Sequence, residues 1–100
     1  PRVHVTVDLY HYLYEGNFEN RDALFLAALQ LFGNEVKIIH LKDAKVVGGK
    51  LVQVAPGQGD FHYSLMIEAI RKYCPNAILV FEGVKALDID VSHRFVETLL

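Results

Sequence analysis

The sequence predicts an α/β fold in which three parallel strands are each followed by a helix. Short apolar runs have the length and composition typical of strands at 3–7, 36–41 and 77–81. Apolar residues recur at helical spacing after each of them, over 21–32, over 60–73 and, from Asp90 or Ser92, up to Leu100. Because parallel strands need crossover connections, this alternation predicts a parallel sheet with right-handed connections.

The first strand–helix pair shows the clearest local signals. Over 3–8, valines alternate with polar residues, which is typical of a strand with two different faces. A loop is expected over 9–20. The helix over 21–32 then has Asn20 as its expected N-cap and Gly33 as its stop signal.

The middle of the chain is expected to be less regular. Val36–Leu41 is apolar almost throughout, as in a strand that is covered on both faces. A long loop is expected over 42–59, with a short extra strand at 50–54 inside it. We expect Asp60 or Ser64 to cap the helix that follows.

Composition and charge argue against several classes of protein. The net charge is −2 and the basic residues are scattered, so neither nucleic acid nor an anionic membrane is an expected partner. The single cysteine, Cys74, allows no internal disulfide and fits a reducing compartment. No apolar run approaches the ~20 residues of a membrane span, and no signal-peptide pattern is present. We therefore expect a soluble cytoplasmic protein.

Three polar residues follow or end the three apolar runs: Asp8, His40 and Glu82. Each alone has an ordinary explanation, as a loop carboxylate, a core histidine or a partnered glutamate. Together they predict one metal site, because the carboxyl ends of parallel strands meet at one edge of the sheet. Two carboxylates and one imidazole favour Mn²⁺ or Mg²⁺, with Co²⁺ or Zn²⁺ as alternatives.

The length and composition suggest that these strands belong to something larger. Three strand–helix units cannot close a barrel, which needs about eight, and an open doubly wound sheet usually has about five strands. The chain is 52 % hydrophobic, slightly above the ~45–50 % typical of soluble domains. We therefore expect a fragment or one chain of an assembly, a homo-oligomer if it exists alone, whose open sheet is covered by more protein.

Four segments resemble the xylose-isomerase-like TIM barrels, a superfamily of sugar and sugar-phosphate isomerases and epimerases that is related to endonuclease IV. They are Asp8-Leu9-Tyr10-His11, His40-Leu41-Lys42-Asp43, Pro56-Gly57-Gln58-Gly59-Asp60-Phe61 and Phe81-Glu82. The resemblance covers essentially the whole chain. It implies that residues 1–100 are the C-terminal part of a single (β/α)₈ barrel domain, with its last three βα units.

The resemblance also implies roles for individual residues. Asp8, His40 and Glu82 match metal ligands of the family, and Glu82 also matches one of its two catalytic carboxylates. His11 matches a histidine that contacts substrate. The other catalytic glutamate of the family has no counterpart here, and Gln58 stands where the family usually has glutamate. From its own chemistry, Lys42 is expected either to bind an anionic substrate or to pair with Asp43.

The predicted function is that of a divalent-metal-dependent isomerase or epimerase of a sugar or sugar phosphate. Such an ion stabilises the enediolate formed when a C–H beside a carbonyl loses its proton, and carboxylates move that proton. The fragment alone is expected to be inactive, and its partners are the remaining barrel strands or another copy of the chain. One alternative is an endonuclease IV-like phosphodiesterase, although 50–55 lacks the Asp-x-His pair that it needs. The other is a non-catalytic α/β binding or assembly module.

Overall fold

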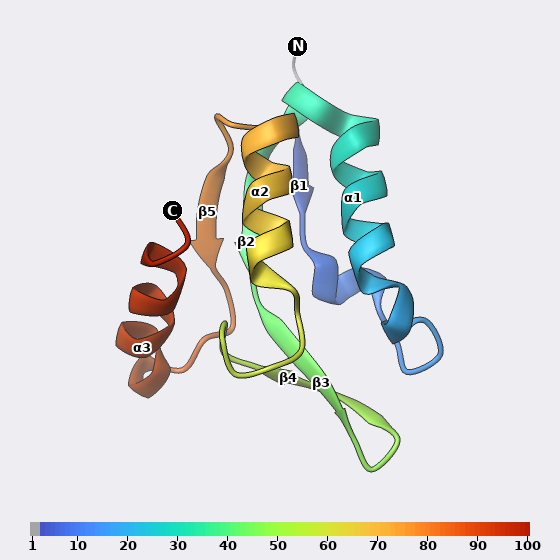
Figure 1. The fold of residues 1–100 in the computed structure, drawn as a ribbon, viewed down its shortest axis with the longest axis vertical. Helices are drawn as coiled ribbons and strands as arrows, with labels where there is room; N and C mark the ends of the chain where they lie inside the picture. Colours follow the sequence, from blue (N-terminus) through green and yellow to red (C-terminus); the bar gives the residue numbers. More distant parts are fainter. Residues whose placement is uncertain (1–2) are drawn as a thin grey trace.

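The computed structural model describes residues 3–100, which fold into an α/β structure with a three-stranded parallel sheet and a separate antiparallel hairpin (Figure 1). The parallel sheet has the order β1 (Val5–Val7), β2 (Val36–Leu41), β5 (Ile78–Phe81). The α-helices are α1 (Arg21–Phe32), α2 (Tyr63–Tyr73) and α3 (Ala86–Glu97), and short 3₁₀ helices span Leu9–Tyr12, Phe18–Asn20 and Gly33–Glu35. Parallel strands that alternate with helices are thus confirmed. None of the helices within 3–100 is long and apolar enough to cross a membrane.

The two faces of the parallel sheet differ in what covers them. On one face, Val7, Ile39 and Leu41 are buried in a common core with Phe25 of α1 and Ile67 of α2. Figure 1 shows α1 and α2 side by side against this face, and α3 beside β5. Burying each such side chain fully contributes about 1.5–3 kcal/mol, so this core holds the sheet to its helices.

The opposite face is open, and we call it the open face; it presents Thr6, Ile38, His40, Ile78 and Val80. Ile78 is 64 % exposed and Val80 is 38 % exposed, whereas Leu79 and Phe81 between and beside them pack against the core. The alternation along β5 therefore places the next even-numbered residue, Glu82, on the side of the open face.

The register of β2 carries one irregularity. Val5 pairs with Val36 but Thr6 pairs with Ile38, so Lys37 is an extra residue on β2. Such a bulge reverses the alternation at that point. It explains how Val36 and Ile39 are both buried although they are three residues apart.

The prediction of a long loop over 42–59 is wrong for most of these residues, which form two strands. β3 (Asp43–Val47) and β4 (Lys50–Val54) form an antiparallel hairpin. Only the strand at 50–54 was expected. Gly48 and Gly49 both have positive φ, 56° and 78°, which is the conformation of a tight two-residue hairpin turn. The hairpin continues directly from β2 and projects beyond the carboxyl edge of the sheet (Figure 1).

Several element boundaries also differ from those expected. The first strand begins at Val5, α2 begins at Tyr63, and α3 begins at Ala86 rather than at Asp90 or Ser92. The first turn of α3 leaves Leu87 93 % exposed, so no apolar face signals its start in the sequence. Neither Asp60 nor Ser64 caps α2, because residues 59–61 are held against β3: the Asp60 N–H donates to the Ala44 carbonyl. Asn20 precedes α1 but makes no side-chain capping bond.

Candidate metal centre

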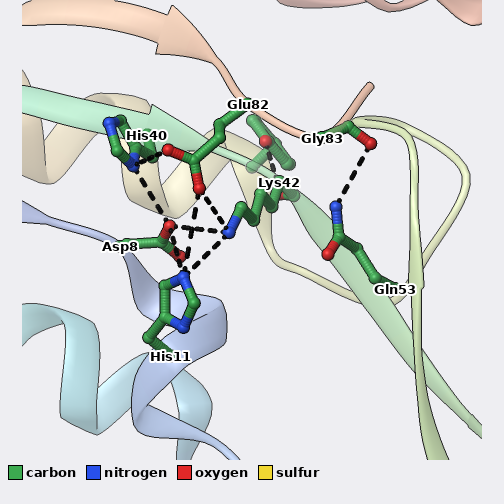
Figure 2. Close-up of polar contacts among 8 residues, drawn as sticks. Asp8, His11, His40, Lys42, Gln53, Glu82 and Gly83 are labelled. Carbon is green, nitrogen blue, oxygen red and sulfur yellow. Dashed lines mark hydrogen bonds and ion pairs between the residues drawn. The ribbon is translucent and has the colours of Figure 1, made fainter. Parts of the chain in front are cut away.

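The carboxyl ends of the three parallel strands bring the predicted metal ligands together. Asp8 follows β1 directly, His40 lies in β2, and Glu82 follows β5 directly. One ligand atom from each lies within 4.8 Å of the others. Figure 2 shows the three side chains pointing toward one another. The convergence that the sequence predicted is therefore present in the structure.

The imidazole of His40 connects the two carboxylates. Its Nδ1 lies 3.2 Å from Asp8 Oδ2 and 2.9 Å from Glu82 Oε2. Asp8 is buried, whereas His40 and Glu82 are partly exposed. The cluster is therefore anchored in the protein at Asp8 and open to solvent at Glu82.

Lys42 is the fourth member of the cluster, and the predicted pair with Asp43 is wrong. Its buried Nζ lies 2.9 Å from Asp8 Oδ2 and 2.8 Å from Glu82 Oε1. Side chains alternate along an extended segment, so Lys42 shares the side of His40 while Asp43 points away. Sequence adjacency suggested the pair, but the pleat of the chain prevents it.

The ion pairs of Lys42 set the charge states at the centre. Burial acts to lower the pKa of Lys42, but its hydrogen bonds to Glu82 and Asp8 outweigh burial, and the pKa is raised. The hydrogen bond from Lys42 in turn lowers the pKa of Glu82 below its usual value, against a smaller effect of desolvation. At neutral pH the Lys42 ammonium therefore faces an ionised Glu82.

His11 lies at the solvent side of the cluster. It belongs to the 3₁₀ helix Leu9–Tyr12, which immediately follows Asp8. Its Nε2 lies 3.1 Å from Lys42 Nζ and 3.4 Å from Asp8 Oδ2. The structure thus brings His11 and Lys42, both predicted to contact substrate, to the three predicted ligands.

One oxygen atom of the cluster has no hydrogen-bond partner within the described residues, and this bears on whether the cluster fits a metal ion. Asp8 Oδ1 is buried and accepts no hydrogen bond from any group within the described residues. A buried polar atom without a partner costs about 1–3 kcal/mol. A cation at Asp8 would satisfy that oxygen, and two carboxylates with one imidazole are suitable ligands for a divalent ion. The donor set of Asp8, His40 and Glu82 therefore fits a metal ion.

Asp43, in the same His-Leu-Lys-Asp segment, has a structural role that the sequence did not indicate. Its Oδ1 accepts from the backbone N–H groups of Ala44 and Phe61 at 2.8 and 2.9 Å, and its Oδ2 accepts from Gly57 N–H at 2.9 Å. Burial raises the pKa of Asp43, and these backbone bonds oppose that shift. The carboxylate holds the segment 57–61 against the start of the hairpin.

The close approach of the segment 57–61 to Asp43 also explains why residue 59 is glycine. A Cβ built there would lie 2.4 Å from Asp43 Oδ1 and 2.5 Å from the Ala44 carbonyl oxygen. Only glycine lets the segment approach so closely. This motif residue is therefore explained by packing rather than by contact with a ligand.

Tyr63 is a supporting residue that sequence reasoning missed. Its hydroxyl donates to the Lys42 carbonyl at 2.7 Å and is buried, so it holds the backbone from which Lys42 extends. Its place at the start of an amphipathic helix gave no signal beyond an ordinary core aromatic. Burial raises the pKa of Tyr63 far above its usual value, so the phenol stays a donor.

Comparisons with protein-family models, with curated proteins and with solved structures each found no match to this chain. The fold and the centre therefore define the class: an α/β structure with a candidate metal centre at the carboxyl edge of its parallel sheet.

Proposed function

We propose that this chain provides the metal-binding part of a divalent-metal-dependent isomerase or epimerase of a sugar or sugar phosphate. Asp8, His40 and Glu82 would hold the ion, with Mn²⁺ or Mg²⁺ favoured by the oxygen-rich set. The main support is the convergence of these three side chains at the carboxyl edge of the sheet. A buried oxygen of Asp8, Oδ1, has no hydrogen-bond partner within the described residues and is free to bind an ion.

We further propose that the three βα units are part of a (β/α)₈ barrel of the xylose-isomerase-like type. Within residues 3–100, β1 and β5 each pair with β2 alone, so each has a free edge. The open face, with Ile78 and Val80 exposed, would line the inside of the barrel, and the centre lies at the carboxyl ends of the strands, where the active sites of barrel enzymes lie. More strands, from the same polypeptide or a second copy, would pair with both edges.

The side chains around the centre suit proton transfer next to a carbonyl group. A bound divalent ion would supply Lewis-acid stabilisation of the negative charge that develops on the substrate oxygens. Glu82 would act as the base, because Lys42 keeps it ionised and it is the more exposed of the two carboxylates. His11, at the solvent side, would orient a substrate hydroxyl. The second carboxylate that returns the proton would come from another strand of the barrel.

A specific observation favours a second candidate, the non-catalytic α/β module. The Lys42 ammonium lies between the two carboxylates at 2.8 and 2.9 Å and already balances part of their charge. In that case the cluster is an ion-pair network that joins the three strands. The phosphodiesterase alternative lacks support of this kind, since 50–55 contains neither an acidic residue nor a histidine.

Metal binding tests the first half of the proposal. Mn²⁺, followed by the electron paramagnetic resonance signal of the free ion, should bind the wild type and bind at least tenfold more weakly to Asp8→Asn, His40→Gln and Glu82→Gln. Asp22→Asn is the matched control, because the ion pair of Asp22 is with the exposed His62 and involves no residue of the centre. Equal affinity in all five proteins would leave only the ion-pair network.

Proton exchange tests the second half. The natural polypeptide that carries this sequence should exchange the hydrogen beside the carbonyl of a ketose with deuterium oxide in the presence of Mn²⁺, followed by proton NMR. Glu82→Gln should abolish the exchange. A protein that binds Mn²⁺ at these ligands but exchanges no proton from a panel of ketoses and ketose phosphates would be a metal-binding module and not an isomerase.

A further inference from the structure

A polar pocket lies beside the candidate metal centre. It has a volume of about 330 Å³. Its lining comes from β4, the segment after β4, the connection between β5 and α3, and the first turn of α3, and it includes Gln53, Gln58, Gly83, Lys85 and Asp88. Gly83 directly follows Glu82, and Figure 2 shows Gln53 reaching Gly83 next to the cluster. A ligand in the pocket would therefore adjoin the centre.

The two amides of the pocket are held only weakly by the protein. Gln53 Nε2 donates to the Gly83 carbonyl at 3.3 Å, and Gln58 Nε2 donates to Asp88 Oδ1 at 3.4 Å. Both distances are beyond the usual 2.7–3.2 Å for such bonds. The side-chain amides can therefore exchange these contacts for better ones with a ligand at small cost.

The charges of the pocket cancel. Lys85 contributes an ammonium and Asp88 a carboxylate. The N-terminal end of α3 would attract an anion, but Asp88 already stands in its first turn. A phosphate group would gain the contact with Lys85 and meet the Asp88 carboxylate as well, so the pocket gives it no net electrostatic attraction.

The lining does match hydroxyl groups. Each hydroxyl both donates and accepts, and the pocket combines N–H donors with carboxylate and amide acceptors. We propose that this pocket binds the hydroxyl-bearing part of an unphosphorylated sugar whose carbonyl end lies at the candidate metal centre. The proposal rests on the proposed function and narrows its substrate to the neutral class. A volume of about 330 Å³ is at the small end of ligand pockets, as a single monosaccharide requires.

NMR signals of the side-chain amides of Gln53 and Gln58 can test whether a sugar binds in this pocket. In the ¹⁵N-labelled protein, D-fructose should shift the side-chain NH₂ signals of Gln53 and Gln58 and leave that of Gln30 unchanged. Gln30 is the matched control because its amide contacts the Tyr73 hydroxyl between α1 and α2. Gln53→Ala and Gln58→Ala should each weaken fructose binding by about threefold to tenfold, as expected for one lost hydrogen bond, and Gln30→Ala should not.

Charged probes decide between neutral and phosphorylated substrates. Fructose 6-phosphate should bind no more tightly than fructose, and inorganic phosphate should shift neither amide. Asp88→Asn should raise the affinity for inorganic phosphate, because it leaves Lys85 unopposed. The proposal is overturned if fructose shifts neither amide, if either phosphate compound binds more tightly than fructose and needs Lys85, or if Asp88→Asn leaves phosphate affinity unchanged.

The same titration separates this proposal from the proposed function. Repeated with EDTA and with Asp8→Asn, fructose should still shift Gln53 and Gln58, since the pocket does not use the metal ligands. Amide shifts without Mn²⁺ binding would support the pocket and contradict the metal-dependent enzyme. Mn²⁺ binding and proton exchange without amide shifts would support the metal-dependent enzyme and contradict sugar binding in the pocket.

Discussion

The two buried aspartates of this protein, Asp8 and Asp43, show how differently the same side chain can be used. Asp43 is 1 % exposed, and both of its oxygens accept backbone N–H groups. Asp8 is 6 % exposed; its Oδ2 contacts only side chains, and its Oδ1 has no partner within residues 3–100. Backbone donors are fixed in place, whereas side-chain donors can move away when a ligand arrives. Asp43 therefore holds a loop, and Asp8 belongs to the candidate metal centre.

The largest effect on stability should come from removing the carboxylate of Asp43, both oxygens of which accept hydrogen bonds. Asp43→Ala leaves three backbone N–H groups, those of Ala44 and Phe61 in buried hydrogen bonds and that of Gly57 in a partly buried one, without their acceptor and releases the segment 57–61. We expect a loss of about 3 kcal/mol in the free energy of unfolding, measured by urea denaturation. Asp22→Ala, at an exposed ion pair, should change it by less than about 0.5 kcal/mol. A loss below about 1 kcal/mol at Asp43 would mean that water replaces the carboxylate.

The unsatisfied carboxylate should behave in the opposite way. Asp8→Asn keeps an oxygen that can accept from Lys42, and Lys42 keeps its ion pair with Glu82, so the metal-free protein should keep its stability to within about 1 kcal/mol. Its affinity for Mn²⁺ should fall at least about 100-fold, which corresponds to about 2.7 kcal/mol. A large loss of stability with unchanged Mn²⁺ affinity would place Asp8 in the same structural class as Asp43.

Competition between Lys42 and a metal ion for the carboxylates of Asp8 and Glu82 can be tested by replacing Lys42. Its ammonium uses the carboxylate oxygens that a metal ion would need, so Lys42→Met should raise the affinity for Mn²⁺ by about tenfold, or about 1.4 kcal/mol. Lys37→Met is the control, since Lys37 is the exposed bulge residue of the same strand. Weaker Mn²⁺ binding in Lys42→Met would show that Lys42 supports the ligands instead of competing for them.

The smallest effect concerns the pH dependence of stability at Asp43. Burial raises the pKa of Asp43 in the folded protein above its unfolded value. The resulting stabilisation is complete below the unfolded pKa, near 3.9, and is lost as the pH rises through the folded pKa. The stability of the wild type relative to Asp43→Asn should therefore decrease from about pH 3.5 upwards, as measured by urea denaturation at each pH. An advantage that grows with pH would mean that the backbone bonds outweigh burial.

Local patterns in the sequence were enough to predict part of the fold. The alternation before Asp8 and the apolar runs that end at His40 and before Glu82 reflect burial of one or both strand faces, which depends on neighbouring residues alone. The hairpin differs from the expected loop because Gly48 and Gly49 form a tight two-residue turn, and a glycine pair is equally typical of a loop. The start of α3 was missed because its first turn is exposed and has no apolar periodicity.

By itself, the sequence determined that Asp8, His40 and Glu82 meet, because parallel strands of similar length end at one edge of a sheet. Only the tertiary structure decided which of two adjacent charged residues joins them. The pleat of the chain turns Lys42 toward the centre and Asp43 toward the segment 57–61, and both destinations are built from residues distant in sequence. The packing also decided that Asp8 Oδ1 stays without a partner, since that depends on every group around it.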